Sequence, residues 1–266
     1  MVRYAEALPY GVEAADWQER INVERLRAER AERARAAMRA AGVPAILVTR
    51  PQHTRYLTGI RGPEFQPQLW YVLFFAEGEP VVFHHAGWIS SYPSQAPWIR
   101  EWRLARAWFS GGGGTGPEVI EEESRLFAAG IADELRARGL AGEPLATVGF
   151  DRPSLEALRA VGLTLVDGTA IMLEASKIKT ADEIACLKMV YAITDAAWNK
   201  VWELARPGVN ADPVAWEALK AALEAGAEEV PQSRLRSGPM SFDRAYQGSG
   251  RILQYGDTAY AGFCSL

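Results

Sequence analysis

Histidine is the side chain best suited to proton transfer and metal binding near neutral pH, and this sequence has three: His53, His84 and His85. None has a partner ligand three or four positions away in a predicted helix. His84 and His85 are adjacent, so on a strand they point to opposite faces and make a poor chelate. Divalent metals need clustered oxygen or imidazole ligands, and we therefore predict no metal site in this chain. His84 is interpreted as a hydrogen-bonded or exposed strand residue, and His53 as a loop residue or a substrate contact.

Tryptophan is unusually frequent in one stretch. Four of the nine tryptophans are Trp88, Trp98, Trp102 and Trp108. Aromatic faces attract quaternary ammonium and similar cations, so these rings could line a pocket, with Trp88 and Trp108 as candidate substrate contacts. Alternatively, they pack the domain or a subunit interface, where tryptophan is enriched.

Other candidate motifs lack residues that their chemistry requires. Gly111–Gly114 lacks the lysine that a phosphate-binding loop requires, so we interpret it as a linker. Ser237–Pro239 is not the G-x-S-x-G of a nucleophile elbow. Cys186 and Cys264 form no C-x-x-C and have no neighbouring histidine, which argues against a zinc site or a disulfide framework.

Composition excludes several classes of protein. The 266 residues are 48% hydrophobic and 23% charged, with a formal net charge of −4. These values are typical of a globular chain and argue against disorder and against a general nucleic-acid binder. No apolar run approaches a membrane helix, and the start of the chain does not resemble a secretory signal. We expect a cytoplasmic protein.

Helix and strand patterns alternate up to about residue 175, which indicates an α/β layered domain. The expected elements are a helix over 17–41, a strand over 43–50, a hairpin over 69–85, a helix over 117–138, a strand over 145–150, a helix over 153–160 and a strand over 163–166. The stretch 88–109 is ambiguous.

The pattern changes after residue 175. Thr180 and Glu183 form a capping box before an apolar helical stripe. Asn210 can cap a second helix, and Gly226 can end it. The stripe comprises Ile184, Leu187, Tyr191, Thr194, Trp198 and Val201.

Several segments, in this order, resemble the pita-bread hydrolases, which include creatinase, Xaa-Pro aminopeptidase and prolidase. Gly42–Gly59 contains a "YLTG" signature, and Leu173–Trp198 is similar to the junction between the two domains of that family. Arg206–Asn210 (RPGVN) is similar to the turn between the first two helices of its catalytic domain, and Ser237–Pro239 (SGP) followed by Ile252–Asp257 (ILQYGD) resembles the approach to its active site.

The resemblance implies a fold. Residues 1–175 would form a creatinase-like N-terminal domain, a mixed sheet with helices across it. Residues 176–266 would form the first part of a pita-bread α+β domain, truncated before the metal ligands. We expect the two helices of this second part to expose an apolar face, because most of the sheet that they would cover is missing.

The resemblance also implies a function. It points to the N-terminal part of a hydrolase that cleaves an amide or C–N bond in a small peptide or amino-acid derivative. Metalloenzymes of the family bind two divalent ions (Mn, Co or Zn) with two Asp, one His and two Glu. The first ligand would fall near Gly262, and 240–244 lacks the usual histidine. The catalytic residues are therefore unknown, and this chain alone is expected to bind no cofactor.

In this family the N-terminal domain can lend residues to a neighbouring subunit's active site. On that basis the substrate-binding candidates are His53, Tyr56, Arg61, Trp88 and Trp108, with Arg61 placed to hold a carboxylate. The expected partners are a small-molecule or dipeptide-like substrate and a second copy of the chain. Two alternatives stay open: a non-catalytic dimerisation or substrate-gating module, and a lyase that acts on a small onium compound.

Overall fold

The computed structural model describes residues 21–61, 69–108, 116–228, 230, 232–242 and 248–264. The chain divides into two compact units, with the boundary between Lys179 and Thr180. The first unit is Glu24–Lys179, and the second contains the described residues from Thr180 onward together with 21–23. The expected helix start at Trp17, with Asp16 as its cap, and the glycine run 111–114 lie outside the described residues.

A six-stranded sheet forms the centre of the first unit, in the order β4-β3-β2-β1-β5-β6. Strands β1 and β2, and β2 and β3, are antiparallel, whereas the pairs β1–β5, β5–β6 and β3–β4 are parallel. The predicted α/β class with a mixed sheet is confirmed. The strands are β1 (Ala45–Val48), β2 (Trp70–Phe75), β3 (Val81–His84), β4 (Glu101–Leu104), β5 (Leu145–Val148) and β6 (Leu165–Asp167).

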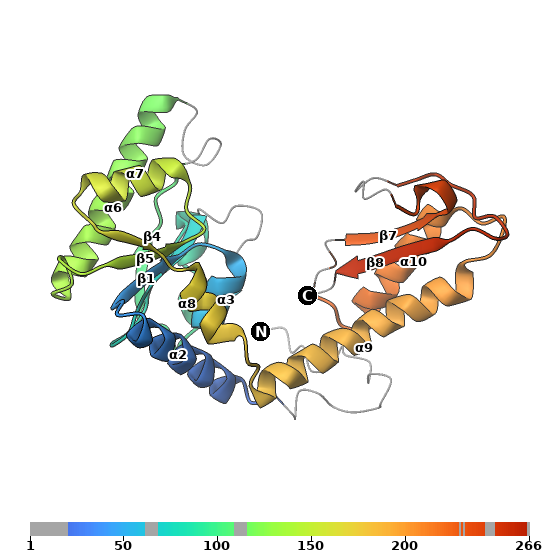
Figure 1. Cartoon of the computed structure of the whole chain (residues 1–266), viewed down its shortest axis with the longest axis horizontal. Coiled ribbons are helices and arrows are strands. Elements are labelled where there is room, and N and C mark those ends of the chain that lie inside the picture. Colours follow the sequence, from blue (N-terminus) through green and yellow to red (C-terminus); the bar gives the residue numbers. More distant parts are fainter. Residues whose placement is uncertain are drawn as a thin grey trace. The chain divides into compact units, whose positions relative to one another are not determined.

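Helices cover both faces of this sheet (Figure 1). On one face lie α2 (Val23–Ala40), α3 (Pro51–Thr58) and α8 (Thr169–Ser176), and on the other lie α6 (Pro117–Ala137) and α7 (Arg152–Ala160). Because each central strand is buried on both sides, β1 and β2 are continuous apolar runs without alternation. The hairpin predicted over 69–85 is the antiparallel pair β2–β3.

The ambiguous stretch 88–109 contains two one-turn helices and an edge strand. The helices are α4 (Ala86–Ile89) and α5 (Tyr92–Gln95), and the strand is β4. Charged side chains attach β4 to α6: Arg103 donates to Glu134 at 2.6 Å and Arg138 donates to Glu101 at 2.8 Å. Because the side chains of β4 are largely polar, the strand lacks the alternation of hydrophobic and polar residues by which a strand is predicted from sequence.

The second unit pairs two helices with a two-stranded antiparallel ribbon. Its elements are α9 (Ala181–Leu204), α10 (Ala211–Glu224), β7 (Gln232–Ser237), the 3₁₀ helix Gly238–Met240 and β8 (Ala259–Cys264). Both predicted caps are present. Thr180 and Glu183 make the reciprocal capping box, and Asn210 accepts from the N–H of Asp212 at 2.9 Å.

The apolar stripe predicted on α9 is divided in the structure. Val201 is buried against α10 and the ribbon, together with Ile193 and Ala197. The other large members of the stripe are exposed, and Trp202 next to them is 83% exposed. The expected exposed apolar face on these helices is therefore confirmed. Its members are Ile184, Leu187, Tyr191, Trp198, Trp202, Trp216 and Leu223.

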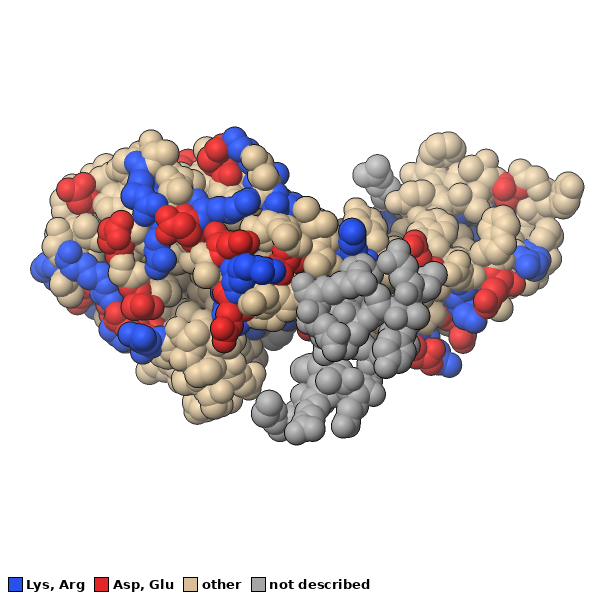
Figure 2. All heavy atoms as spheres, turned by 90° about the horizontal axis from the view of Figure 1, so that it is seen from below, with Lys and Arg blue, Asp and Glu red and all other residues tan. Residues whose placement is uncertain are grey.

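The charged surface matches the composition. On the face in Figure 2, basic and acidic side chains are interspersed over the first unit. No helix among the described residues is both long enough and apolar enough to cross a bilayer.

Candidate functional site

The "YLTG" signature lies at the end of α3, directly after the central strand β1. Gly59 ends this helix in the left-handed conformation (φ 73°), and its N–H donates to the carbonyl of Arg55. Tyr56 is buried, and its hydroxyl donates to the carbonyl of Ala175 at 2.7 Å. The phenol therefore ties α3 to α8.

His53 lies on α3 rather than in a loop, and it is half-buried. Burial lowers the pKa of His53 below its usual value, and the Arg50 guanidinium lowers it further. The imidazole is therefore neutral at pH 7, when it can donate at one ring nitrogen and accept at the other.

The chain after α3 meets the tryptophan-rich stretch. Tyr92 donates its hydroxyl to the carbonyl of Arg61 at 3.0 Å, and the indole N–H of Trp98 donates to the carbonyl of Thr58 at 2.7 Å. The guanidinium of Arg27 lies over the Trp98 ring, 3.9 Å from its centroid. That cation of the chain itself occupies one face of Trp98.

His84 ends β3 inside a group of aromatic rings, which we call the histidine box (His84, Trp70, Trp88 and Tyr92). The imidazole centroid lies 4.3 Å from the Tyr92 ring, 5.6 Å from Trp70 and 5.7 Å from Trp88. His84 is fully buried. Tyr92 therefore contacts both the His84 imidazole and the backbone of Arg61.

The prediction that His84 is either hydrogen-bonded or exposed is wrong, because the imidazole is buried among aromatic rings that offer it no hydrogen bond. Within the part of the chain that the structure describes, both ring nitrogens of His84 and the indole nitrogen of Trp70 are buried without a hydrogen-bond partner. Burial is the main cause that lowers the pKa of His84 to about 4, with a contribution from His85, while a backbone contact to His85 opposes the shift. The imidazole is neutral over the physiological range.

Trp108 lies on the opposite face of the sheet from the histidine box. It packs in the core beside Tyr71 and Phe127 and is 1% exposed. The structure therefore does not bring Trp88 and Trp108 together, and the four tryptophans line no common pocket. Trp102 belongs to the first face, where its indole N–H donates to the carbonyl of Ile99 at 3.1 Å.

The described residues do not provide a metal site. No group of three or more His, Cys, Asp or Glu side chains within the described ranges could hold an ion. Gly262, at the position expected for the first metal ligand, lies in β8 opposite Arg234. The donor set that a dinuclear centre needs is not formed by these residues.

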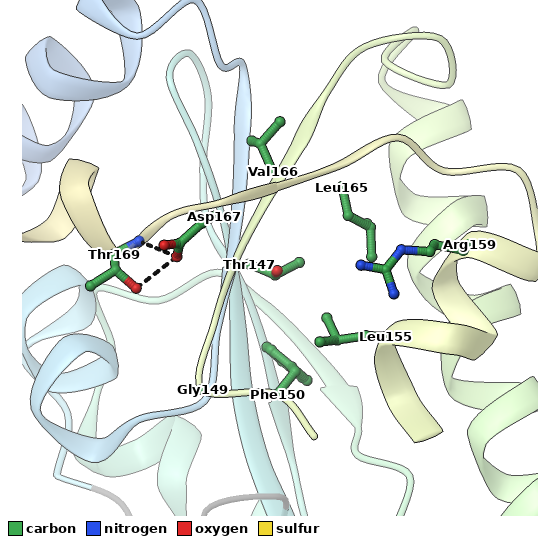
Figure 3. A pocket seen from close by; sticks show the side chains of 9 residues that line it. All are labelled: Thr147, Gly149, Phe150, Leu155, Arg159, Leu165, Val166, Asp167 and Thr169. Carbon is green, nitrogen blue, oxygen red and sulfur yellow. Dashed lines mark hydrogen bonds between the residues drawn. The ribbon is translucent and has the colours of Figure 1, made fainter. Parts of the chain in front are cut away.

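A cavity of about 290 Å³ opens where β5 and β6 end (Figure 3). It is lined by the ends of both strands, by the loop after β5 and by α7. Its polar members include Arg159, Asp167 and Thr147, and Asp167 accepts from the backbone and hydroxyl of Thr169 at 2.9 and 2.7 Å. Sequence reasoning did not single out Arg159 or Thr147. The signal that could have located this cavity is a general rule: ligands of α/β sheets bind beyond the carboxyl ends of parallel strands.

Comparison with known families decides the relationship of the first unit. Residues 30–175 match the creatinase/prolidase N-terminal domain. The chain belongs to this family. No curated protein sequence matches the chain.

Solved structures similar to this creatinase/prolidase-type chain include three peptidases. The dipeptidase PepE from Mycobacterium ulcerans is 23% identical with a TM-score of 0.67, over 92% of this chain and 61% of its own. The Xaa-Pro dipeptidase from Bacillus anthracis is 20% identical with a TM-score of 0.65, over 91% and 61%. The recombinant prolidase from Thermococcus sibiricus is 18% identical with a TM-score of 0.66, over 90% and 64%. The chain thus shares their fold and spans about three-fifths of their length.

Proposed function

We propose that this chain is the N-terminal part of a hydrolase that cleaves an amide or C–N bond in a dipeptide or a related amino-acid derivative. One observation carries the proposal. The structural likeness covers 90–92% of the chain for the three peptidases compared above. It therefore includes the second unit as well as the family domain at 30–175.

The catalytic residues of this hydrolase would lie outside the described residues, because these offer no cluster that suits a metal. We expect a complete protein to bind two divalent ions (Mn, Co or Zn) through residues outside the described ranges. The contribution of the first unit is then to bind and orient substrate.

Three of the candidate contacts remain suited to that role. Arg61 has a guanidinium that can bind a substrate carboxylate in a bidentate manner, His53 is half-buried and neutral, and Trp88 is half-buried at the histidine box. The polar atoms of Tyr56 and Trp108 are used within the fold, so we assign these two a positioning role. We further propose a cytoplasmic homodimer.

The test is a hydrolysis assay on the complete protein purified from its natural source. We expect cleavage of Leu-Pro when Mn²⁺ or Co²⁺ is supplied, and little cleavage of Leu-Leu. Creatine and a small onium compound are assayed in parallel. Cleavage of creatine alone or elimination from the onium compound would replace the peptidase assignment. No turnover of any of these would favour the non-catalytic gating module, and a monomer in light scattering would refute the homodimer.

A further inference from the structure

We infer that the cavity at the ends of β5 and β6 binds a short zwitterion with an apolar body, of dipeptide size. The first argument is its position. Strands β1, β5 and β6 run parallel, and α7 connects β5 to β6. A crevice beyond the carboxyl ends of such strands is where α/β sheets bind ligands. At about 290 Å³ the cavity is close to the lower limit of about 300 Å³ for small-molecule sites.

The walls of the cavity are suited to an apolar body. Leu155 of α7, Leu165 of β6 and Phe150 of the loop after β5 line it, and all three are half-buried. Thr147 lies between them, and Figure 3 shows its side chain directed toward Arg159. Apolar walls with a few convergent polar groups are typical of a binding site rather than of a simple surface hollow.

The positive end of the cavity is Arg159. Its guanidinium extends from α7 toward the centre of the cavity (Figure 3). The neighbouring acid on the same helix is already paired, because Arg152 donates to Glu156 at 2.6 Å. The Arg159 carbonyl accepts from Gly162, but among the described residues no hydrogen bond or ion pair engages the Arg159 guanidinium. A planar guanidinium with five N–H donors is suited to a ligand carboxylate.

The negative end is Asp167, on the other side of the cavity (Figure 3). Hydrogen bonds from the hydroxyl and then the backbone N–H of Thr169 lower the pKa of this carboxyl. Both bonds use one oxygen, Oδ1, which leaves Oδ2 for a ligand ammonium. With a cation at one side and an anion at the other, the cavity matches the two ends of an unblocked dipeptide.

The test measures binding of L-leucyl-L-leucine to the purified 266-residue chain by isothermal titration calorimetry. We expect N-acetyl-leucyl-leucine and leucyl-leucinamide, which each lack one charge, to bind roughly tenfold more weakly or worse. Arg159→Gln and Asp167→Asn should weaken binding of the unblocked dipeptide to the same extent. Asparagine keeps the side-chain oxygen that accepts from Thr169.

Arg152→Gln is the matched control, because Arg152 lies on the same helix with its side chain 86% exposed and outside the cavity. It should leave the affinity unchanged. Circular dichroism spectra and urea unfolding establish that each variant is folded. The inference is overturned if the unblocked dipeptide does not bind at millimolar concentration, or if Arg159→Gln binds it as tightly as the unchanged chain. Neither result bears on the proposed hydrolase activity, which this inference does not require.

Discussion

The indole N–H of Trp108 donates to both carboxylate oxygens of Asp151, at 3.0 and 3.2 Å. The same carboxylate caps α7, where it accepts from the backbone N–H of Ser154 at 3.1 Å and from its hydroxyl at 2.6 Å. One side chain thus satisfies a buried indole and starts the helix that carries Arg159.

We expect Asp151→Ala to lower the free energy of unfolding by about 2–3 kcal/mol, because it removes a helix cap worth about 1 kcal/mol and leaves a buried donor unsatisfied. Urea unfolding followed by tryptophan fluorescence measures this. Asp133→Ala is the control, since Asp133 is 70% exposed in a surface pair and should change stability by less than about 0.5 kcal/mol. Equal losses from the two substitutions would show that the Trp108–Asp151 bond contributes nothing specific.

His84 predicts a pH dependence of stability. Its pKa is about 4 in the folded chain against an ordinary value of 6.5, so between these values the unfolded chain binds more protons. Stability should therefore fall as the pH decreases from about 7 to 5, with a contribution of at most about 1.4 kcal/mol per pH unit. His84→Phe should flatten this part of the profile in urea unfolding at pH 5, 6 and 7. His85→Asn removes only the smaller contribution to the shift and should retain most of the slope. If His84→Phe keeps the full slope, His84 is not the titrating group.

Gly59 and Gly130 should respond to alanine in opposite directions. Gly59 has φ 73°, and a Cβ there would lie 2.6 Å from Cδ of Arg27, so Gly59→Ala should cost about 1–2 kcal/mol. Gly130 lies inside α6 with open space at its Cβ position, so Gly130→Ala should stabilise the chain by roughly 0.5–1 kcal/mol. Thermal unfolding of both variants measures the difference. An unchanged midpoint for Gly59→Ala would contradict the backbone requirement at the "YLTG" turn.

Tyr56 and Arg61 should separate a positioning role from a binding role. Tyr56→Phe removes the bond to the Ala175 carbonyl and should lower stability by about 1 kcal/mol, with KM for Leu-Pro unchanged in the complete enzyme. Arg61→Gln should raise KM about tenfold or more and leave the unfolding midpoint within 1 °C of the unchanged protein. A raised KM for Tyr56→Phe, or an unchanged one for Arg61→Gln, would reverse the assignment.

The sequence predicted correctly those elements whose formation depends on a few neighbouring residues. The capping box at Thr180 depends only on four neighbouring residues, and the hairpin of β2 and β3 only on two apolar runs and the turn between them. The stripe on α9 illustrates the limit. Helical spacing shows which residues share a face, but whether Trp198 or Val201 is buried depends on the elements that pack against that face.

The candidate sites depend on contacts between distant parts of the chain. Arg159 and Asp167 line one cavity only because β6 pairs with β5 and α7 packs beside them. His84 lies in the histidine box because α4 and α5 place Trp88 and Tyr92 against the end of β3, in a stretch that the sequence left ambiguous. Likewise, the closeness of the four tryptophans in the sequence did not show that Trp108 packs in the core on the opposite face of the sheet.

We propose that these two units are the N-terminal part of a longer hydrolase. The most direct measurement is the intact mass of the protein purified from its natural source. We predict a mass well above the 29.2 kDa of this chain, sufficient for the remaining two-fifths of a dipeptidase-sized protein. A mass of 29.2 kDa would contradict the claim, since the described residues form no metal-binding cluster, and would favour a gating or dimerisation module.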